Sequence, residues 1–489
     1  MSQINIIGSG FSSLATACYL AKEGHKVTVF EKNVHLGGRA QVFKKEGFLF
    51  DMGPTWYWMP DIFERFFADF DKSPSDFYEL HRLDPAYRVF FDEMNYVDIA
   101  GSLEKIIQTF ESIEKGSGAK LRKFIGNAED NYNIAIKDLV YKPGLSPLEL
   151  INFKTASKLN LFFTSISKQV KRQFKNPKLQ QILEFPVLFL GAKPTDTPAF
   201  YNFMNYADFG LGTWNPKGGM SEVSKAMVTL GQSLGVTYKT NQCVEKIVVE
   251  NGKTRALVAN DITYPSDIIV SGADYHHTEK LLDENLRMYS EKYWDKKTFA
   301  PSSLLFYVGF DTKLKNVLHH TLFFDTDFVK HSSEIYDTKE WPKNPLFYAS
   351  FPSKSDDIMA PEGKEAATFL IPIAPGLKDD DNTRKHYFDM IITRLEKLTQ
   401  QEVRKHILFQ KSYAVNDFIK DYNSYKGNAY GLANTLFQTA FLRPKVKSNK
   451  VKNLYFTGQL TVPGPGVPPA IISGKIVSEI IAREQAYNV

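Results

Sequence analysis

Short apolar runs alternate with glycine-rich turns at the start of the chain. Residues 4–7 and 26–30 are apolar or β-branched, and residues 14–22 between them are rich in Ala and Leu. This pattern predicts two buried strands joined by a helix, which ends at Gly24 as its C-cap. A βαβ unit therefore opens the chain, with glycines at 8 and 10 in its first turn.

The residues of this unit suit a dinucleotide. Gly8 allows a tight turn, Gly10 lets the backbone approach a pyrophosphate, and the helix N-terminus supplies N–H groups. Glu31, at the end of the second strand, can accept both ribose hydroxyls and disfavours a 2′-phosphate. Ser13 stands where the fingerprint has a third glycine, and we expect slight spreading of helix from strand rather than loss of the site.

A second glycine turn follows at Gly37-Gly38-Arg39. Paired glycines expose backbone N–H groups, and Arg39 can neutralise a phosphate. A second phosphate-binding element so early in the chain favours a flavin dinucleotide over a nicotinamide one. The alternative is an ordinary loop with a surface arginine.

One stretch has an unusual charge pattern. Residues 151–178 contain no Asp or Glu, and their basic residues are Lys154, Lys158, Lys168, Lys171, Arg172, Lys175 and Lys178. Within the stretch, apolar residues at the helical spacing are Leu159, Phe162, Phe163, Ile166 and Val170. The spacing predicts an amphipathic helix, which either lies on an anionic membrane or packs on the protein with a solvated basic face.

Composition narrows the class of protein. A chain of 489 residues with 43% hydrophobic and 24% charged residues is globular and long enough for two domains. Its net charge of +5 and lack of a recognition motif argue against nucleic-acid binding. Two distant cysteines, the absence of a signal-peptide pattern and the absence of an apolar run of ~18 residues favour a cytoplasmic protein. The 14% aromatic content indicates a large aromatic core or an aromatic-lined cavity.

Several longer motifs carry a family resemblance. The segments GSGFSSL, FEKNVHLGGRA, FLFDMGPTWYWMP and NLYFTGQLTVPGPGVPPAIISGK resemble the signatures of phytoene desaturase-type bacterial carotenoid desaturases, which belong to the broader group that includes amine oxidases. Blocks between them, such as NPKGGMSEVSKAM and SDIIVSGADYHHTEKLL, resemble the same family in the same order. The resemblance spans nearly the whole chain.

The resemblance implies an FAD site and assigns residues to it. The implied cofactor residues are Gly8, Gly10, Phe11, Ser12, Glu31, Lys32, Gly38, Arg39, Ala40, Gly53, Pro54, Thr55, Val244, Gly458, Gln459, Val467 and Pro468. Val467 and Pro468 would open a helix whose N-terminus faces the flavin and stabilises negative charge there. The chain departs from the family at Ser12 and Ser13, where glycines are usual, and at Gln459, where an acid is common.

The implied fold is α/β (α+β overall), with a Rossmann-like FAD-binding domain interleaved with a substrate domain of mixed sheet and helices. We expect the FAD-binding domain to comprise residues 1–90, 216–285 and 426–489. The substrate domain then comprises residues 91–215 and 286–425, including the basic region at 151–178.

The implied reaction is dehydrogenation of an acyclic or monocyclic carotenoid, including 1-hydroxylated ones, with hydride transfer to the flavin. Trp56, Tyr57 and Trp58 are candidates for the wall of the substrate channel, and no residue is assigned as the proton acceptor. We predict no metal site, and we interpret the His276-His277 and His319-His320 pairs as surface or structural residues. The expected partners are the carotenoid, the inner face of the cytoplasmic membrane, and oxygen or a quinone as electron acceptor. An FAD-dependent amine oxidase, a carotenoid isomerase and a binding module remain alternatives.

Overall fold

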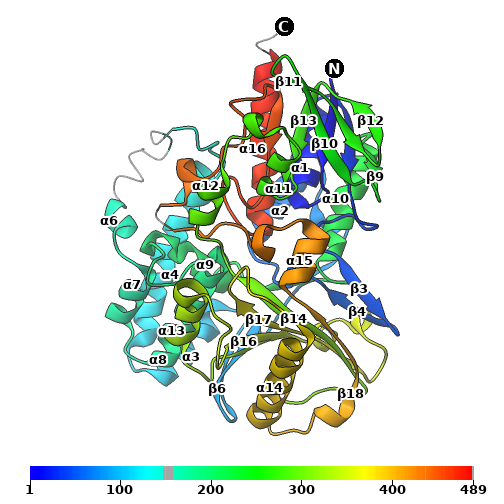
Figure 1. Ribbon diagram of the computed structural model, residues 1–489. Helices are drawn as coiled ribbons and strands as arrows, with labels where there is room; N and C mark the ends of the chain where they lie inside the picture. Colours follow the sequence, from blue (N-terminus) through cyan, green and yellow to red (C-terminus); the bar gives the residue numbers. More distant parts are fainter. Residues whose placement is uncertain (147–148, 150–157, 436, 487–489) are drawn as a thin grey trace.

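A five-stranded parallel sheet forms the upper part of the molecule in Figure 1. The computed structural model describes residues 1–146, 149, 158–435 and 437–486. In spatial order, the strands are β19 (Leu454–Phe456), β13 (Ile268–Ser271), β1 (Gln3–Ile7), β2 (Lys26–Phe30) and β9 (Thr237–Lys239). All four pairings are parallel. The sheet therefore combines three distant parts of the chain, as expected for a Rossmann-like domain.

Three helices pack together beside this sheet: α1 (Phe11–Lys22), α10 (Ser221–Ser233) and α16 (Val467–Ala486). The contact between α1 and α16 is close because Gly474 has no side chain: a Cβ there would lie 2.6 Å from the Ser12 carbonyl oxygen. The contact between α1 and the sheet is equally close at Ser13. A Cβ on Gly272, directly after β13, would lie 2.0 Å from Ser13 Oγ. Ser13 is thus accommodated because the residue facing it is glycine.

A seven-stranded mixed sheet forms the second, lower part of the molecule (Figure 1). Its strands, in spatial order, are β18 (Ile407–Tyr413), β14 (Ser302–Phe310), β17 (Glu365–Ile373), β16 (Phe347–Ser350), β15 (His320–Phe323), β6 (Tyr87–Asp92) and β7 (Asn95–Ile99). Helix α14 (Asp381–Thr399) packs on it through apolar residues that include Phe388 and Ile391. Because β6 begins at Tyr87, the chain enters this sheet before the predicted domain boundary at residue 90.

A group of helices lies to one side of the second sheet (Figure 1). It contains α3 (Leu103–Ile113), α4 (Ser117–Ile134), α6 (Leu159–Phe162), α7 (Ile166–Gln173), α8 (Pro177–Glu184) and α9 (Phe203–Phe209). Phe110, Phe124 and Phe174 are buried at the centre of this group. Within the described residues, no helix is both long and apolar enough to cross a bilayer.

The predicted amphipathic helix at 159–170 is not continuous, so this prediction is corrected. Ser165 has extended backbone and its Oγ accepts from the Lys168 N–H, which makes Ser165 the N-cap of α7 and separates α7 from α6. Ile166 and Val170 are fully buried in the core, and Phe163 between the helices is exposed. Residues 151–157 of the basic stretch, including Lys154, lie outside the described residues.

Three smaller sheets and five further α-helices complete the described part of the fold. The smaller sheets are β3 (Val42–Lys45) with β4 (Phe48–Asp51), β5 (Leu80–Arg82) with β8 (Trp214–Pro216), and β10 (Val244–Glu250), β11 (Lys253–Ala259) and β12 (Ile262–Pro265). The remaining α-helices are α2 (Pro60–Ala68), α11 (Tyr275–Lys280), α12 (Glu291–Lys296), α13 (Phe328–Ser333) and α15 (Val415–Tyr422).

Candidate functional site

All of the predicted cofactor residues line one cavity, which also extends between the two sheets. The cavity begins at the carboxyl ends of the parallel strands: Gly8 follows β1, Glu31 follows β2, Gly272 follows β13 and Gly458 closely follows β19. Ligands of open parallel sheets bind at this edge. Residues far apart in sequence therefore meet where a dinucleotide is expected.

The first glycine turn leaves room for a ligand. Gly8 has a φ of +84°, which favours glycine, and its N–H donates to the Phe30 carbonyl at 2.8 Å. Gly10 has ordinary extended backbone, with φ −69° and ψ 170°, and a Cβ there would meet no protein atom within 4 Å. The fold itself thus does not require a glycine at position 10. A ligand that approaches the backbone at the start of α1 does require it.

Glu31 is buried at the end of β2 and helps to hold the turn. Its Oε2 accepts from the Ser9 N–H at 3.0 Å and the Ser9 hydroxyl at 2.7 Å, and Oε1 accepts from the Asn33 N–H at 2.9 Å. A carboxylate offers about four acceptor positions, so acceptor capacity remains for ribose hydroxyls. The neighbouring Lys32 donates to the Lys420 carbonyl at 2.5 Å, which ties the end of α15 to this edge.

The second glycine turn contacts the first. Gly37 and Gly38 have positive φ angles of 111° and 59°, and a Cβ on Gly38 would lie 2.9 Å from Gly10 Cα. A Cβ on Gly53 would lie 2.2 Å from the Arg39 carbonyl oxygen, so the segment that leads to Pro54 also packs on this turn. Glycines at 38 and 53 therefore let three backbone segments meet at the cavity edge.

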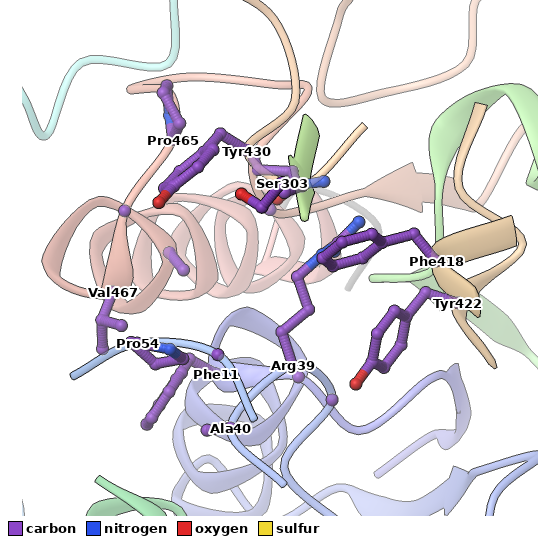
Figure 2. Close-up of a pocket in the computed structure, with 18 of the residues that line it drawn as sticks. Phe11, Arg39, Ala40, Pro54, Ser303, Phe418, Tyr422, Tyr430, Pro465 and Val467 are labelled. Carbon is purple, nitrogen blue, oxygen red and sulfur yellow. The ribbon is translucent and has the colours of Figure 1, made fainter. Parts of the chain in front are cut away.

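Arg39 is a half-buried cation with neutral hydrogen-bond partners. Its guanidinium donates to Ser424 Oγ and the Asn428 carbonyl, both at 3.3 Å, and lies 5.1 Å from the centre of the Tyr422 ring. Gln459 accepts from both terminal nitrogens, at 3.2 and 3.1 Å, in the amide orientation that satisfies both groups. Figure 2 shows Arg39 extending from its turn toward α15.

The electrostatics of Arg39 fit an anionic cofactor. Arg39 forms no ion pair with any described carboxylate, and its Nε is buried without a hydrogen-bond partner. Burial lowers the pKa of the guanidinium, because removal from water disfavours its charge. A pyrophosphate in the cavity would supply both the missing negative charge and an acceptor.

The other predicted residues complete the cradle. Val467 and Pro468 are the first residues of α16, and both line the cavity. Figure 2 shows Val467 beside Pro54. Val244, at the start of β10, also lines the cavity. Positive helix-end charge thus lies near Pro54 and Thr55, where the flavin ring is expected.

Beyond Thr55 the cavity becomes apolar. Its lining there includes Trp56, Trp58, Phe185, Leu188, Met204, Leu322, Phe324, Phe328, Ile335, Leu346 and Leu370. Tyr57, predicted to line the channel, does not. It has extended backbone and pairs with Trp214, so Trp56 and Trp58 point to one side and Tyr57 to the other. Tyr57 is fully buried and stacks on Phe63 of α2, with ring centres 4.2 Å apart.

A polar group that the sequence does not predict lies in this apolar region. The Tyr348 hydroxyl lies 2.6 Å from His320 Nδ1 and 2.9 Å from Thr55 Oγ1. His320 and His319 are buried, and the His320 ring stacks on Trp56 with centres 3.9 Å apart. His320 and Tyr348 come from the paired strands β15 and β16, where Tyr348 pairs with Leu322, two residues from His320. No local pattern marks such a pair.

Curated relatives match over nearly the full chain. A carotenoid 3,4-desaturase of Haloarcula japonica is 42% identical over 99% of this chain and 98% of its own length. A 4,4′-diapophytoene desaturase of Staphylococcus haemolyticus is 31% identical, over 98% and 99%. A zeta-carotene-forming phytoene desaturase of Myxococcus xanthus is 29% identical, over 98% and 93%.

Solved structures share the fold at low sequence identity. An oxidoreductase from Methanosarcina mazei superposes with a TM-score of 0.64 at 19% identity, covering 98% of this chain and 100% of the other. A triple mutant of putrescine oxidase gives 0.62 at 12% identity, covering 99% of both chains.

The family described as flavin containing amine oxidoreductase matches residues 11–482. The match covers every strand of the two sheets except β1, and every segment of the cavity edge that follows the first turn. Together with the glycine turns and the unpaired charge of Arg39, this match identifies the cofactor as FAD. The chain therefore belongs to the flavin containing amine oxidoreductase family.

Proposed function

We propose that this chain is an FAD-dependent carotenoid desaturase that introduces C=C bonds into an acyclic or monocyclic carotenoid, 1-hydroxylated substrates included. The observation that carries the proposal is the continuity of the cofactor cradle with an apolar, aromatic-lined space beyond Thr55. No described carboxylate lines that space, so it suits an apolar polyene and provides no negative charge to pair with a cationic amine. The full-length desaturase relatives support the same substrate class.

The cofactor and the residues that line the cavity have different roles in the reaction. When bound, FAD supplies an acceptor for hydride. The chain holds the polyene between Trp56, Trp58 and the strands β15–β17, and it excludes water from the reacting carbons. Such alignment and desolvation are the main contributions a protein makes to this type of chemistry. Electrons then leave the site to an external acceptor, oxygen or a quinone.

The test is anaerobic incubation of the FAD-loaded protein with phytoene, a monocyclic carotene, a 1-hydroxylated acyclic carotenoid and putrescine. We expect bleaching of flavin absorbance together with carotenoid products that absorb at longer wavelength, resolved by liquid chromatography. Isomerised carotenoid without bleaching would instead support an isomerase, and bleaching by putrescine alone would support an amine oxidase. Addition of oxygen or a soluble quinone to the bleached sample then identifies the acceptor.

We also propose that the protein docks peripherally on the inner face of the cytoplasmic membrane through an apolar rim. The rim consists of four exposed apolar side chains: Leu145, Phe163, Phe437 and Leu442. Their loops contact one another. Gly144 lies against Ala440, the Tyr201 hydroxyl bonds Thr439 Oγ1 at 2.9 Å, and Phe162 stacks on Phe200.

Charge beside the rim favours an anionic surface. Lys168, Lys171 and Arg172 on α7 are exposed, and Lys175 follows them. The contacts of the α7 apolar face with the core leave its basic face in solvent, so α7 contributes charge rather than inserted apolar area. The rim is connected to the cavity, because Val462 packs on Gly144 shortly before the lining residue Pro465.

A further inference from the structure

Removal of two hydrogens from adjacent carbons requires a destination for a proton as well as for a hydride. In the apolar half of the cavity, the titratable side chains that line the described surface are His331, Tyr336, Tyr348 and Tyr430. Carboxylates line only the cofactor half of that surface, at Glu31, Asp274 and Asp421. The proton acceptor is therefore sought among these four residues.

His331 is already committed to other bonds. Its Nδ1 accepts from the Leu346 N–H at 3.0 Å, so Nε2 carries the hydrogen and donates to the Pro372 carbonyl at 2.9 Å. Both nitrogens of the neutral ring are used, and burial lowers the pKa of His331 to about 4. Tyr336 and Tyr430 have no basic partner among the described residues, and burial raises the pKa of both phenols.

Tyr348 differs because its hydroxyl has a base behind it. The phenol oxygen lies 2.6 Å from His320 Nδ1, to which it donates when the neutral ring carries its hydrogen on Nε2, and Thr55 Oγ1 lies 2.9 Å from the same oxygen. Thr55 itself lines the cavity beside Pro54, so this oxygen lies next to the expected position of the flavin ring. The hydroxyl thus joins the reacting region to a fully buried imidazole.

His320 is uncharged and can accept a proton. Burial holds its pKa well below the ordinary value, so the ring is neutral at physiological pH and an imidazolium forms there only at a desolvation cost. Its Nε2 is buried without a partner, and its ring lies parallel to Trp56, 3.9 Å away with an interplanar angle of 11°. An imidazolium formed there would lie over the negative face of the indole, which offsets part of the desolvation cost.

We propose that Tyr348 accepts the substrate proton while its own hydroxyl proton passes to His320 Nδ1. The proposal rests on the desaturase function. One C–H bond breaks with its electron pair, which leaves as hydride to the oxidant FAD, and the carbon becomes electron-deficient. The adjacent C–H bond gives its pair to the new C=C bond and its proton to the Tyr348 oxygen. The imidazolium of His320 returns the proton through Tyr348 to the open cavity between turnovers.

The experiment compares Tyr348→Phe, His320→Asn and the double variant with the wild type. We expect each single change to lower the rate of carotenoid desaturation by at least about 100-fold, as for loss of a general base. Because the two residues form one relay, the double variant should be no slower than the slower single variant. Tyr57→Phe, which removes a buried phenol outside the cavity, is the matched control and should retain the wild-type rate.

Two further measurements separate a relay from a structural role. The wild-type rate should fall in D₂O, because the Tyr348 hydroxyl proton exchanges with solvent, and this effect should be absent in Tyr348→Phe. Nitrogen NMR of ¹⁵N-histidine protein without substrate should show His320 with a bare Nδ1 whose resonance shifts in Tyr348→Phe. Flavin absorbance per chain should stay unchanged in every variant.

Two outcomes overturn the relay. One is a Tyr348→Phe protein that desaturates at more than about a third of the wild-type rate; the other is additive losses in the double variant. If a variant fails to load FAD, the NMR measurement on the wild type decides, since a protonated Nδ1 in His320 contradicts the proposal. A wild-type protein that desaturates no carotenoid contradicts the proposed function instead.

Discussion

Gln459 accepts hydrogen bonds from both terminal nitrogens of Arg39, at 3.2 and 3.1 Å. An acid at this position would pair with the guanidinium and cancel its charge. The amide satisfies the geometry and leaves the positive charge of Arg39 available to a phosphate. Gln459, although it departs from the family pattern, is therefore compatible with a pyrophosphate site. Because it is neutral, it also leaves more positive charge at that site than an acid would.

The first prediction concerns Arg39. Arg39→Gln should weaken FAD binding by about 10- to 100-fold, since a hydrogen bond to a charged group contributes about 1.5–3 kcal/mol. Arg39→Lys keeps the charge but loses the planar fork, so its affinity should fall between those of the wild type and Arg39→Gln. Titration of the FAD-free proteins by flavin fluorescence measures this order, and equal affinities would contradict the role given to the charge.

The second prediction separates folding from cofactor binding at Gly10. A Cβ at this position meets no protein atom within 4 Å, so Gly10→Val should leave the unfolding temperature of the FAD-free protein unchanged. The same side chain would occupy the space of the pyrophosphate, so the purified variant should be colourless. A folded, yellow Gly10→Val protein would show that the cofactor does not approach this turn.

The third prediction concerns the contact between α1 and the sheet. Gly272→Ala should destabilise the protein by about 1–3 kcal/mol, because the new Cβ would lie 2.0 Å from Ser13 Oγ. Ser13→Gly alone should bind FAD normally, and Ser13→Gly combined with Gly272→Ala should recover most of the lost stability. Urea unfolding of the four proteins forms a double-mutant cycle, and additive effects would mean that the two sites do not share this space.

The fourth prediction concerns the buried carboxyl group of Asp208. Asp208 accepts from the Tyr87 hydroxyl at 2.7 Å, and burial raises its pKa to about 7. Since this value lies above the ~3.9 of an unfolded chain, its contribution to stability is complete below about pH 4 and is lost as the pH rises through 7.

Asp208→Asn removes this titration. The stability of the variant relative to the wild type should therefore increase between pH 4 and 7, by up to about 1.4 kcal/mol per pH unit. Urea unfolding at four pH values from 5 to 8 measures the difference. Parallel pH profiles for the two proteins would show that Asp208 is ionised in the folded state.

The fifth prediction tests the apolar rim. Phe163→Ser with Phe437→Ser should reduce co-sedimentation with vesicles of anionic phospholipid, and Lys168→Glu with Lys171→Glu should reduce it further. Ile262→Ser, which removes an exposed apolar residue from β12, is the control and should bind like the wild type. Binding that is independent of anionic lipid, or unchanged in the rim variants, would exclude this docking surface.

The cofactor cradle could be predicted from sequence because its parts follow local rules. Gly8, Gly10 and Glu31 lie in one βαβ unit, where spacing alone fixes their positions at the sheet edge. The neutral partners of Arg39 could not be predicted in this way. Ser424 and Asn428 reach it only through the tertiary fold, from a loop nearly four hundred residues away.

Two predictions are wrong for reasons that can be found in the local sequence. Trp56, Tyr57 and Trp58 are adjacent in sequence, but alternation along an extended segment places Tyr57 on the opposite side. The predicted helix at 159–170 includes Ser165, a residue type that favours the N-cap position. The Tyr348–His320 pair is different, because neither residue identifies the other before the pairing of β15 and β16 is known.

The packing of Ser13 against Gly272 changes how the dinucleotide fingerprint of this chain is defined. The constraint applies to the combined size of two facing residues, and not to the identity of one. Here the small partner lies on the strand, and the helix carries the larger residue. A fingerprint written as a single N-terminal motif therefore describes one half of a two-part rule, whose other half stands after β13.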